Sequence, residues 1–139
     1  MPLSDPIRRL QEAMKQSSLK AVVIEPGPAL DSLTGVRWGR SERTFALVVP
    51  VAGDPVYVLP AFEERRARER VGPNGTVRLW QEDESPFALI AHVLAEWKIS
   101  AGRIGLDDSL RFFVYDGIRK AAPQFEYVSA SGTLKAAGK

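Results

Sequence analysis

The residues with the clearest chemical potential lie between positions 36 and 43, directly after a Leu-Thr-Gly sequence. They are Arg37, Trp38, Arg40, Glu42 and Arg43. Arginine offers a planar set of N–H donors that matches a carboxylate, and tryptophan is a large, rigid anchor at interfaces. The segment is therefore predicted to contact a substrate, an anionic group or a protein partner. The alternative is a solvated loop whose tryptophan folds onto the core.

Two acidic clusters, residues 82–84 and Asp107-Asp108, are the other places that could bind a metal or a phosphoryl group. Both follow predicted strands and precede predicted helices, where carboxylates interact favourably with the positive helix end. We interpret them as capping and solvated side chains. The single histidine, His92, is interpreted as a partly exposed surface residue, because one imidazole cannot build a histidine-based zinc site.

Composition excludes several classes of site and partner. The chain has no cysteine, which excludes disulfides, thiolate nucleophiles and cysteine-based zinc sites. Neither the dinucleotide-binding nor the P-loop glycine spacing is present. Nineteen basic and 17 acidic residues are interspersed, and the net charge of +2 gives no electrostatic case for nucleic acid or an anionic membrane. No secretion signal and no apolar run of about 20 residues is visible, so a cytoplasmic location is predicted.

Alternating helices and strands must position these side chains. The 139 residues, 45% of them hydrophobic, suffice for one soluble domain with its own core. Runs rich in β-branched residues predict strands, and apolar residues at helical spacing predict helices. The predicted strands are 20–24, 44–50, 55–59, 76–80, 103–106 and 125–128. The predicted helices are 6–17, 61–71, 86–97 and one from a Ser109 cap to residue 121, with a further helical turn at 29–35 ended by Gly35.

The order of these elements predicts the fold class. Helices between strands favour crossover connections and a sheet covered on both faces. The short turn at 51–54 joins two strands into an antiparallel hairpin, so the sheet is expected to be mixed. The predicted fold is α/β, a three-layer α/β/α sandwich in which a mixed six-stranded sheet is flanked by about four helices.

Several short motifs occur in a fixed order along nearly the whole chain. They are an Arg-x-Leu-x-x-x-Met helix from Arg8 to Met14, Leu-Thr-Gly at 33–35, Pro-Val-Tyr-Val-Leu-Pro at 55–60, the stretch from Trp80 to Phe87 and Arg-Ile-Gly-Leu-Asp at 103–107. Together they resemble the N-terminal domain of creatinases, prolidases and aminopeptidases P, a family of Xaa-Pro peptidases and related hydrolases. The resemblance implies the fold of that domain, which contains a ribonuclease H-like motif.

The resemblance also implies a longer protein. In the family a pita-bread catalytic domain follows, and its aspartate, histidine and glutamate ligands hold a pair of divalent metal ions, manganese, cobalt or zinc. This chain lacks those ligand positions and is expected to hold no cofactor itself. Residues 1–132 are expected to form the N-terminal domain and residues 133–139 the start of a linker. The expected partners are the protein's own catalytic domain, a second subunit in a homodimer and a proline-containing peptide.

In the family the loop after Leu-Thr-Gly, here residues 36–43, can approach the active site of the partner subunit. The resemblance thus implies roles in dimerisation and substrate gating for a non-catalytic domain. Dipeptidase-like members often carry aspartate and histidine where this chain has Gly39 and Ser41, and asparagine and tyrosine where it has Ala29 and Ser32. A creatinase-like or ectoine-hydrolase-like enzyme is therefore an alternative to the Xaa-Pro peptidase. A stand-alone, non-enzymatic binding module is a second alternative.

Overall fold

Six strands form one mixed sheet in the computed structural model, which describes residues 3–73 and 75–138. The strands are β1 (Leu19–Ile24), β2 (Ala46–Pro50), β3 (Val56–Pro60), β4 (Thr76–Trp80), β5 (Arg103–Leu106) and β6 (Glu126–Ser129). They lie in the order β4-β3-β2-β1-β5-β6. The β1–β2 and β2–β3 pairs are antiparallel, and the β1–β5, β3–β4 and β5–β6 pairs are parallel. The predicted mixed sheet is confirmed.

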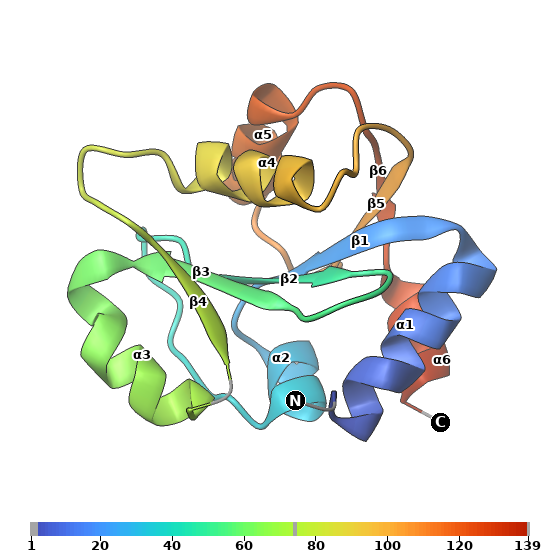
Figure 1. Cartoon of the computed structure of the whole chain (residues 1–139), viewed down its shortest axis with the longest axis horizontal. Coiled ribbons are helices and arrows are strands. Elements are labelled where there is room, and N and C mark those ends of the chain that lie inside the picture. Colours follow the sequence, from blue (N-terminus) through green and yellow to red (C-terminus); the bar gives the residue numbers. More distant parts are fainter. Residues whose placement is uncertain (1–2, 74, 139) are drawn as a thin grey trace.

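Helices cover both faces of the sheet (Figure 1). They are α1 (Asp5–Ser17), α2 (Pro28–Thr34), α3 (Glu64–Val71), α4 (Pro86–Glu96), α5 (Phe112–Ala121) and α6 (Ser131–Ala137), with a short 3-10 helix η1 (Ala61–Glu63) before α3. The helices α4 and α5 lie on one face, and α1, α2, α3 and α6 lie on the other (Figure 1). The predicted three-layer α/β/α sandwich is confirmed, but the described residues form six α-helices where about four were predicted.

The central strand β1 supplies side chains to an apolar core on each face. Val22 and Ile24 belong to the core shared with α1 and α2, and Ala21 and Val23 belong to the core shared with α4 and α5. Side chains alternate between the faces of a strand, so a strand covered on both sides reads as an unbroken apolar run. Burying each large apolar side chain contributes about 1.5–3 kcal/mol before conformational entropy is subtracted.

The two helices that were not counted in the prediction, α2 and α6, are both short. Gly35 ends α2 in the left-handed conformation, as expected for the helical turn at 29–35. The helix α6 crosses the domain boundary predicted at residue 132; its Thr133 and Ala137 are buried, and Arg9 Nε of α1 donates to the Ala137 carbonyl at 3.0 Å. Short helices have little intrinsic stability, so α6 depends on its packing against α1, which composition does not reveal.

Ser109 does not cap α5, contrary to the prediction. The helix begins at Phe112, and no side chain caps its first turn. Instead, the Ser109 backbone N–H and hydroxyl donate to the two carboxylate oxygens of Asp107 at 3.2 and 3.0 Å. Aspartate side chains favour such local turns, and this one delays the start of the helix.

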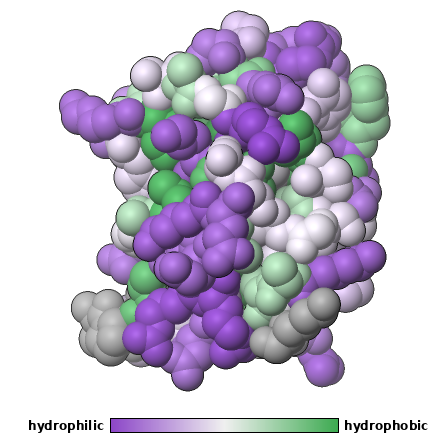
Figure 2. All heavy atoms as spheres, turned by 90° about the vertical axis from the view of Figure 1, so that its right-hand side faces the viewer, coloured by the Kyte–Doolittle hydropathy of each residue, from purple (hydrophilic) through white to green (hydrophobic). Residues whose placement is uncertain are grey.

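Hydrophilic residues cover most of the side of the molecule that is shown in Figure 2. Across residues 3–73 and 75–138, large hydrophobic side chains are exposed at three positions, Phe62, Phe112 and Phe113. Within the same ranges, no helix combines the length and the apolar character that crossing a bilayer requires.

The hydroxyl of Tyr127 in β6 predicts a stability change at high pH. It donates to the Ala122 carbonyl at 2.5 Å, and burial raises the pKa of Tyr127 to about 12. In the unfolded state the pKa of a tyrosine is about 10, so the folded state keeps the hydroxyl proton of Tyr127 to higher pH. The stabilisation that results is complete below pH ~10 and is lost as the pH rises towards ~12. Urea unfolding across this range should show a falling free energy of unfolding. Tyr127→Phe should make the decline shallower, and an unchanged slope in that variant would contradict the prediction.

Candidate functional site

The segment that carries the predicted site residues is a loop between α2 and β2. Its ends are fixed, because Val36 and Phe45 are buried in the core shared with α1 and α2. The middle of the loop lies at the surface. There Trp38 and Arg43 are half-buried, and Arg37, Arg40 and Glu42 are exposed.

Trp38 is partly folded onto the core and partly accessible. Its ring stacks on Phe45 with centroids 4.8 Å apart and an interplanar angle of 28°. The guanidinium of Arg66, from α3, lies over the Trp38 ring at 4.0 Å from its centroid. A cation over an indole face is attracted by the ring quadrupole. Trp38 is therefore held in one place while part of its surface stays available to a partner.

Arg40 is committed to contacts within the fold. Its Nε donates to the Pro26 carbonyl at 2.7 Å, its Nη1 to the Ser109 carbonyl at 2.7 Å and its Nη2 to the Ser109 hydroxyl at 2.9 Å. These bonds attach the loop to the segment after β1 and to the turn between β5 and α5. Most of its donors are thus occupied, and the residue is better placed to fix the loop than to grip a ligand.

Arg37 and Arg43 each pair with an acidic side chain. Arg37 Nε lies 3.1 Å from Asp31 Oδ2, and the Arg37 side chain is 83% exposed. Arg43 donates to Glu82 at 2.7 Å and to Glu42 at 3.1 Å. The hydrogen bond from Arg43 lowers the pKa of Glu82, and the same contact raises the pKa of Arg43. Both guanidinium groups lie at the surface, where they could reach an anionic group.

A hollow of about 240 Å³ opens between the loop and the start of α3. It is lined by Trp38, Ser41, Arg43, Phe62, Glu63 and Arg66, among others. Phe62 is 62% exposed, and the guanidinium of Arg43 lies 5.0 Å from the centre of its ring. The hollow therefore combines exposed aromatic surface with arginines, a composition typical of interface hot spots.

Sequence reasoning missed a second exposed aromatic surface, at the start of α5. Phe112 is 73% and Phe113 43% exposed, and the guanidinium of Arg111 lies 4.8 Å from the centre of the Phe113 ring. Arg111 also donates to the Ser41 carbonyl at 2.8 Å, which connects this surface to the loop. The two adjacent phenylalanines at the start of a helix could have predicted this surface, because neighbouring helical residues cannot both face one core.

The other chemical candidates stay apart from this region. His92 is exposed and lies 3.0 Å from Glu96, as its interpretation as a surface residue requires. Glu84 accepts a hydrogen bond from the Gln81 backbone, and Asp108 accepts one from Ser129. Within residues 3–73 and 75–138, no group of three or more His, Cys, Asp or Glu side chains could hold a metal ion. The donors that a pair of divalent metals requires are not brought together by these residues.

A profile of the creatinase/prolidase N-terminal domain matches residues 6–137, nearly the whole chain. The chain belongs to the creatinase/prolidase N-terminal domain family. This creatinase/prolidase N-terminal domain is 31% identical over 128 residues to an uncharacterized peptidase of Schizosaccharomyces pombe, covering 82% of this chain and 27% of that protein. It is 34% identical over 84 residues to a probable dipeptidase of Mycobacterium tuberculosis, covering 59% of this chain and 22% of that protein.

Among solved structures, a dipeptidase from Pyrococcus horikoshii superposes on this creatinase/prolidase N-terminal domain with a TM-score of 0.81 at 28% identity. The superposition covers 94% of this chain and 35% of that one. The chain therefore spans about a quarter to a third of the length of these relatives. The 36–43 loop lies inside the region that the family profile matches.

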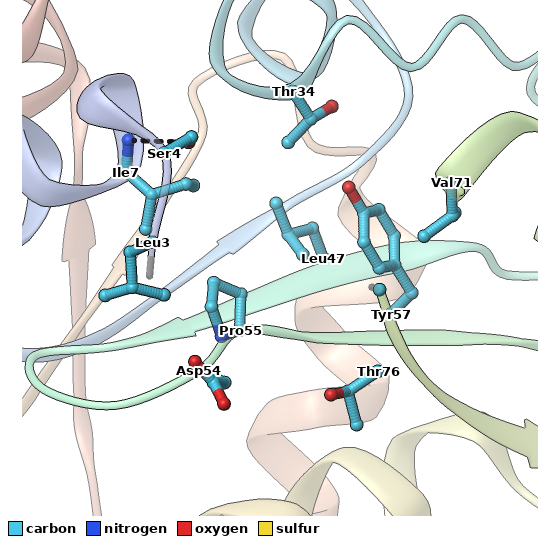
Figure 3. A pocket seen from close by; sticks show the side chains of 11 residues that line it. Leu3, Ser4, Ile7, Thr34, Leu47, Asp54, Pro55, Tyr57, Val71 and Thr76 are labelled. Carbon is cyan, nitrogen blue, oxygen red and sulfur yellow. Dashed lines mark hydrogen bonds between the residues drawn. The ribbon is translucent and has the colours of Figure 1, made fainter. Parts of the chain in front are cut away.

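The creatinase/prolidase N-terminal domain also has a mostly apolar pocket away from the loop, between the start of α1 and the β2–β3 turn (Figure 3). Its volume is about 420 Å³, and Leu3, Ile7, Leu47 and Val71 contribute apolar walls. The Tyr57 hydroxyl points towards the side that Thr34 occupies (Figure 3). Burial raises the pKa of Tyr57, so this hydroxyl stays neutral. The Asp54 carboxylate also lines this pocket, so its walls combine apolar surface with an acidic group.

Proposed function

We propose that this chain is the non-catalytic N-terminal domain of a metal-dependent Xaa-Pro dipeptidase or aminopeptidase, and that it serves in dimerisation and substrate gating. Membership of the family and similarity to dipeptidases support this proposal. In the longer protein, a catalytic domain following this one supplies the ligands for two divalent metal ions. A cytoplasmic location remains a prediction.

The observation that carries the interface role is the position of the exposed phenylalanines around the 36–43 loop. Phe62 lies against Arg43 of the loop, and Phe113 lies against Arg111, which donates to the Ser41 carbonyl. Phe112 precedes Phe113 and is the most exposed of the three. Exposed apolar patches often mark sites where another protein binds. This surface is therefore the one that we assign to the catalytic site region of a partner subunit.

The chemistry of the loop suits a peptide substrate. A dipeptide carries a free carboxylate, and Arg43 presents its guanidinium group in the same hollow as the Trp38 ring. A loop that covers a bound peptide also keeps water away from it and restricts its length. In this proposal the loop selects and encloses the substrate, while the metals of the catalytic domain activate the water.

Variants of the full-length protein test the proposal. Trp38→Ala is expected to lower kcat/KM for an Xaa-Pro dipeptide about tenfold, because hot-spot residues contribute more than about 1 kcal/mol. Hydrolysis of Xaa-Pro and non-proline dipeptides measures the effect, and light scattering after size exclusion measures the oligomeric state. His92→Ala, an exposed change on α4, is the control and should alter neither. If folded Trp38→Ala protein keeps wild-type turnover and wild-type oligomeric state, the gating role is wrong.

A further inference from the structure

Glu25 is a buried acidic residue that directly follows β1. Its side chain has 0% exposure. A carboxylate without water is costly unless hydrogen bonds and an opposite charge compensate it. Arg111 supplies both, because its backbone N–H donates to Glu25 Oε1 at 2.8 Å and its Nη2 to Glu25 Oε2 at 2.7 Å. The Arg111 Nε lies 3.1 Å from the same Oε2.

The guanidinium of Arg111 also reaches the loop. The same Nη2 that binds Glu25 donates to the Ser41 carbonyl at 2.8 Å. Glu25 thus holds the Arg111 guanidinium in place, and Arg111 in turn holds the loop backbone at residue 41. An arginine can do this because its planar group presents several N–H donors at once, whereas a lysine ammonium is a point charge on a flexible stem.

A second arginine completes the attachment from the opposite direction. Arg40 is a loop residue that donates to the Pro26 carbonyl, next to Glu25, and to Ser109, in the same turn that precedes Arg111. Arg40 thus bonds both the segment after β1 and the turn before α5, and its neighbour Ser41 accepts from Arg111 at the end of that turn. No buried side-chain nitrogen or oxygen in the described ranges lacks a hydrogen-bond partner, so this network is satisfied.

We propose that Glu25 and Arg111 are positioning residues that hold the 36–43 loop in the conformation in which Trp38 and Arg43 face a partner. A fully satisfied buried ion pair is often no more stabilising than an apolar pair, but it does require one geometry of its partners. The role of this geometry in gating rests on the proposed function. The attachment of the loop is a property of this chain alone.

Limited trypsin digestion of the chain under native conditions tests the inference. Arg37, Arg40 and Arg43 are cleavage sites inside the loop, and Arg8 and Lys15 in α1 report opening elsewhere. Arg111→Lys keeps a positive charge opposite Glu25 but loses the planar donor set. It should raise the ratio of loop cleavage to α1 cleavage about tenfold, as expected from losing a charge-assisted hydrogen bond. Glu25→Gln should change the ratio in the same direction.

Arg119→Lys, on the exposed face of the same helix, is the matched control and should leave the ratio unchanged. A merely structural role for the ion pair would raise cleavage at both places in parallel. An unchanged ratio in Arg111→Lys and Glu25→Gln would therefore overturn the inference. Because the digestion needs no hydrolytic activity, its failure is distinct from a failure of the proposed function.

Discussion

Replacing Phe45 by alanine is expected to lower the free energy of unfolding by about 3–5 kcal/mol. Phe45 is 2% exposed and packs against Trp38 and Tyr57, with ring centroids 4.8 and 6.1 Å away. Alanine loses these contacts and leaves a cavity that the surrounding strands cannot close. The expected loss is a large part of the ~5–15 kcal/mol that stabilises a typical domain. Urea unfolding followed by circular dichroism measures it.

The matched control for Phe45→Ala is Phe62→Ala, which removes the same side chain from an exposed position. Phe62 is 62% exposed, so its loss should change the free energy of unfolding by no more than about 0.5 kcal/mol. Equal effects of the two substitutions would show that Phe45 does not belong to the core. The comparison also separates stability from binding, because Phe62 is proposed to act at an interface.

Arg111→Met should destabilise the domain by about 3–5 kcal/mol, because it leaves the Glu25 carboxylate buried without its cation. Methionine keeps much of the side-chain volume, so the lost charge and donors dominate the effect. The Arg111 backbone N–H still donates to Glu25, which limits the loss. Urea unfolding near neutral pH measures the free energy.

The double variant Glu25→Leu with Arg111→Met separates this cause from lost packing. Removing both charges abolishes the desolvation cost, so much of the stability should return. If the double variant is less stable than Arg111→Met alone, the buried carboxylate is not the source of the destabilisation.

The strands and the long helices could be predicted from the sequence because their apolar residues follow simple periods. The apolar run of β1 and the helical spacing in α4 both lead to the correct elements. Elements stabilised by tertiary packing could not be predicted in this way. The helix α6 contains a glycine and only seven residues, and it depends on α1, which is distant in sequence. Ser109 looked like a helix cap, but Asp107 competes for its hydroxyl.

Part of the candidate site could also be predicted. The density of arginine and tryptophan in residues 36–43 identified the loop, but not which side chains are free. Arg40 turns inward to Pro26 and Ser109, whereas Arg37 stays exposed. Glu25 and Arg111 were not singled out, because they are 86 positions apart and only the parallel pairing of β1 with β5 brings them together. Long-range pairs of this kind leave no local signal.

The packing of α6 on α1 has a consequence for how the domain is made. Arg9 and Ala137 are hydrogen-bonded although 128 positions separate them. During synthesis on the ribosome, this contact can therefore form only after residue 137 has emerged. The first half of α1 and the end of α6 are therefore close together in the folded domain. A polypeptide that continues past α6 leaves the domain close to α1, where the domain began. Such a domain can be joined to a larger protein without a change in its own fold.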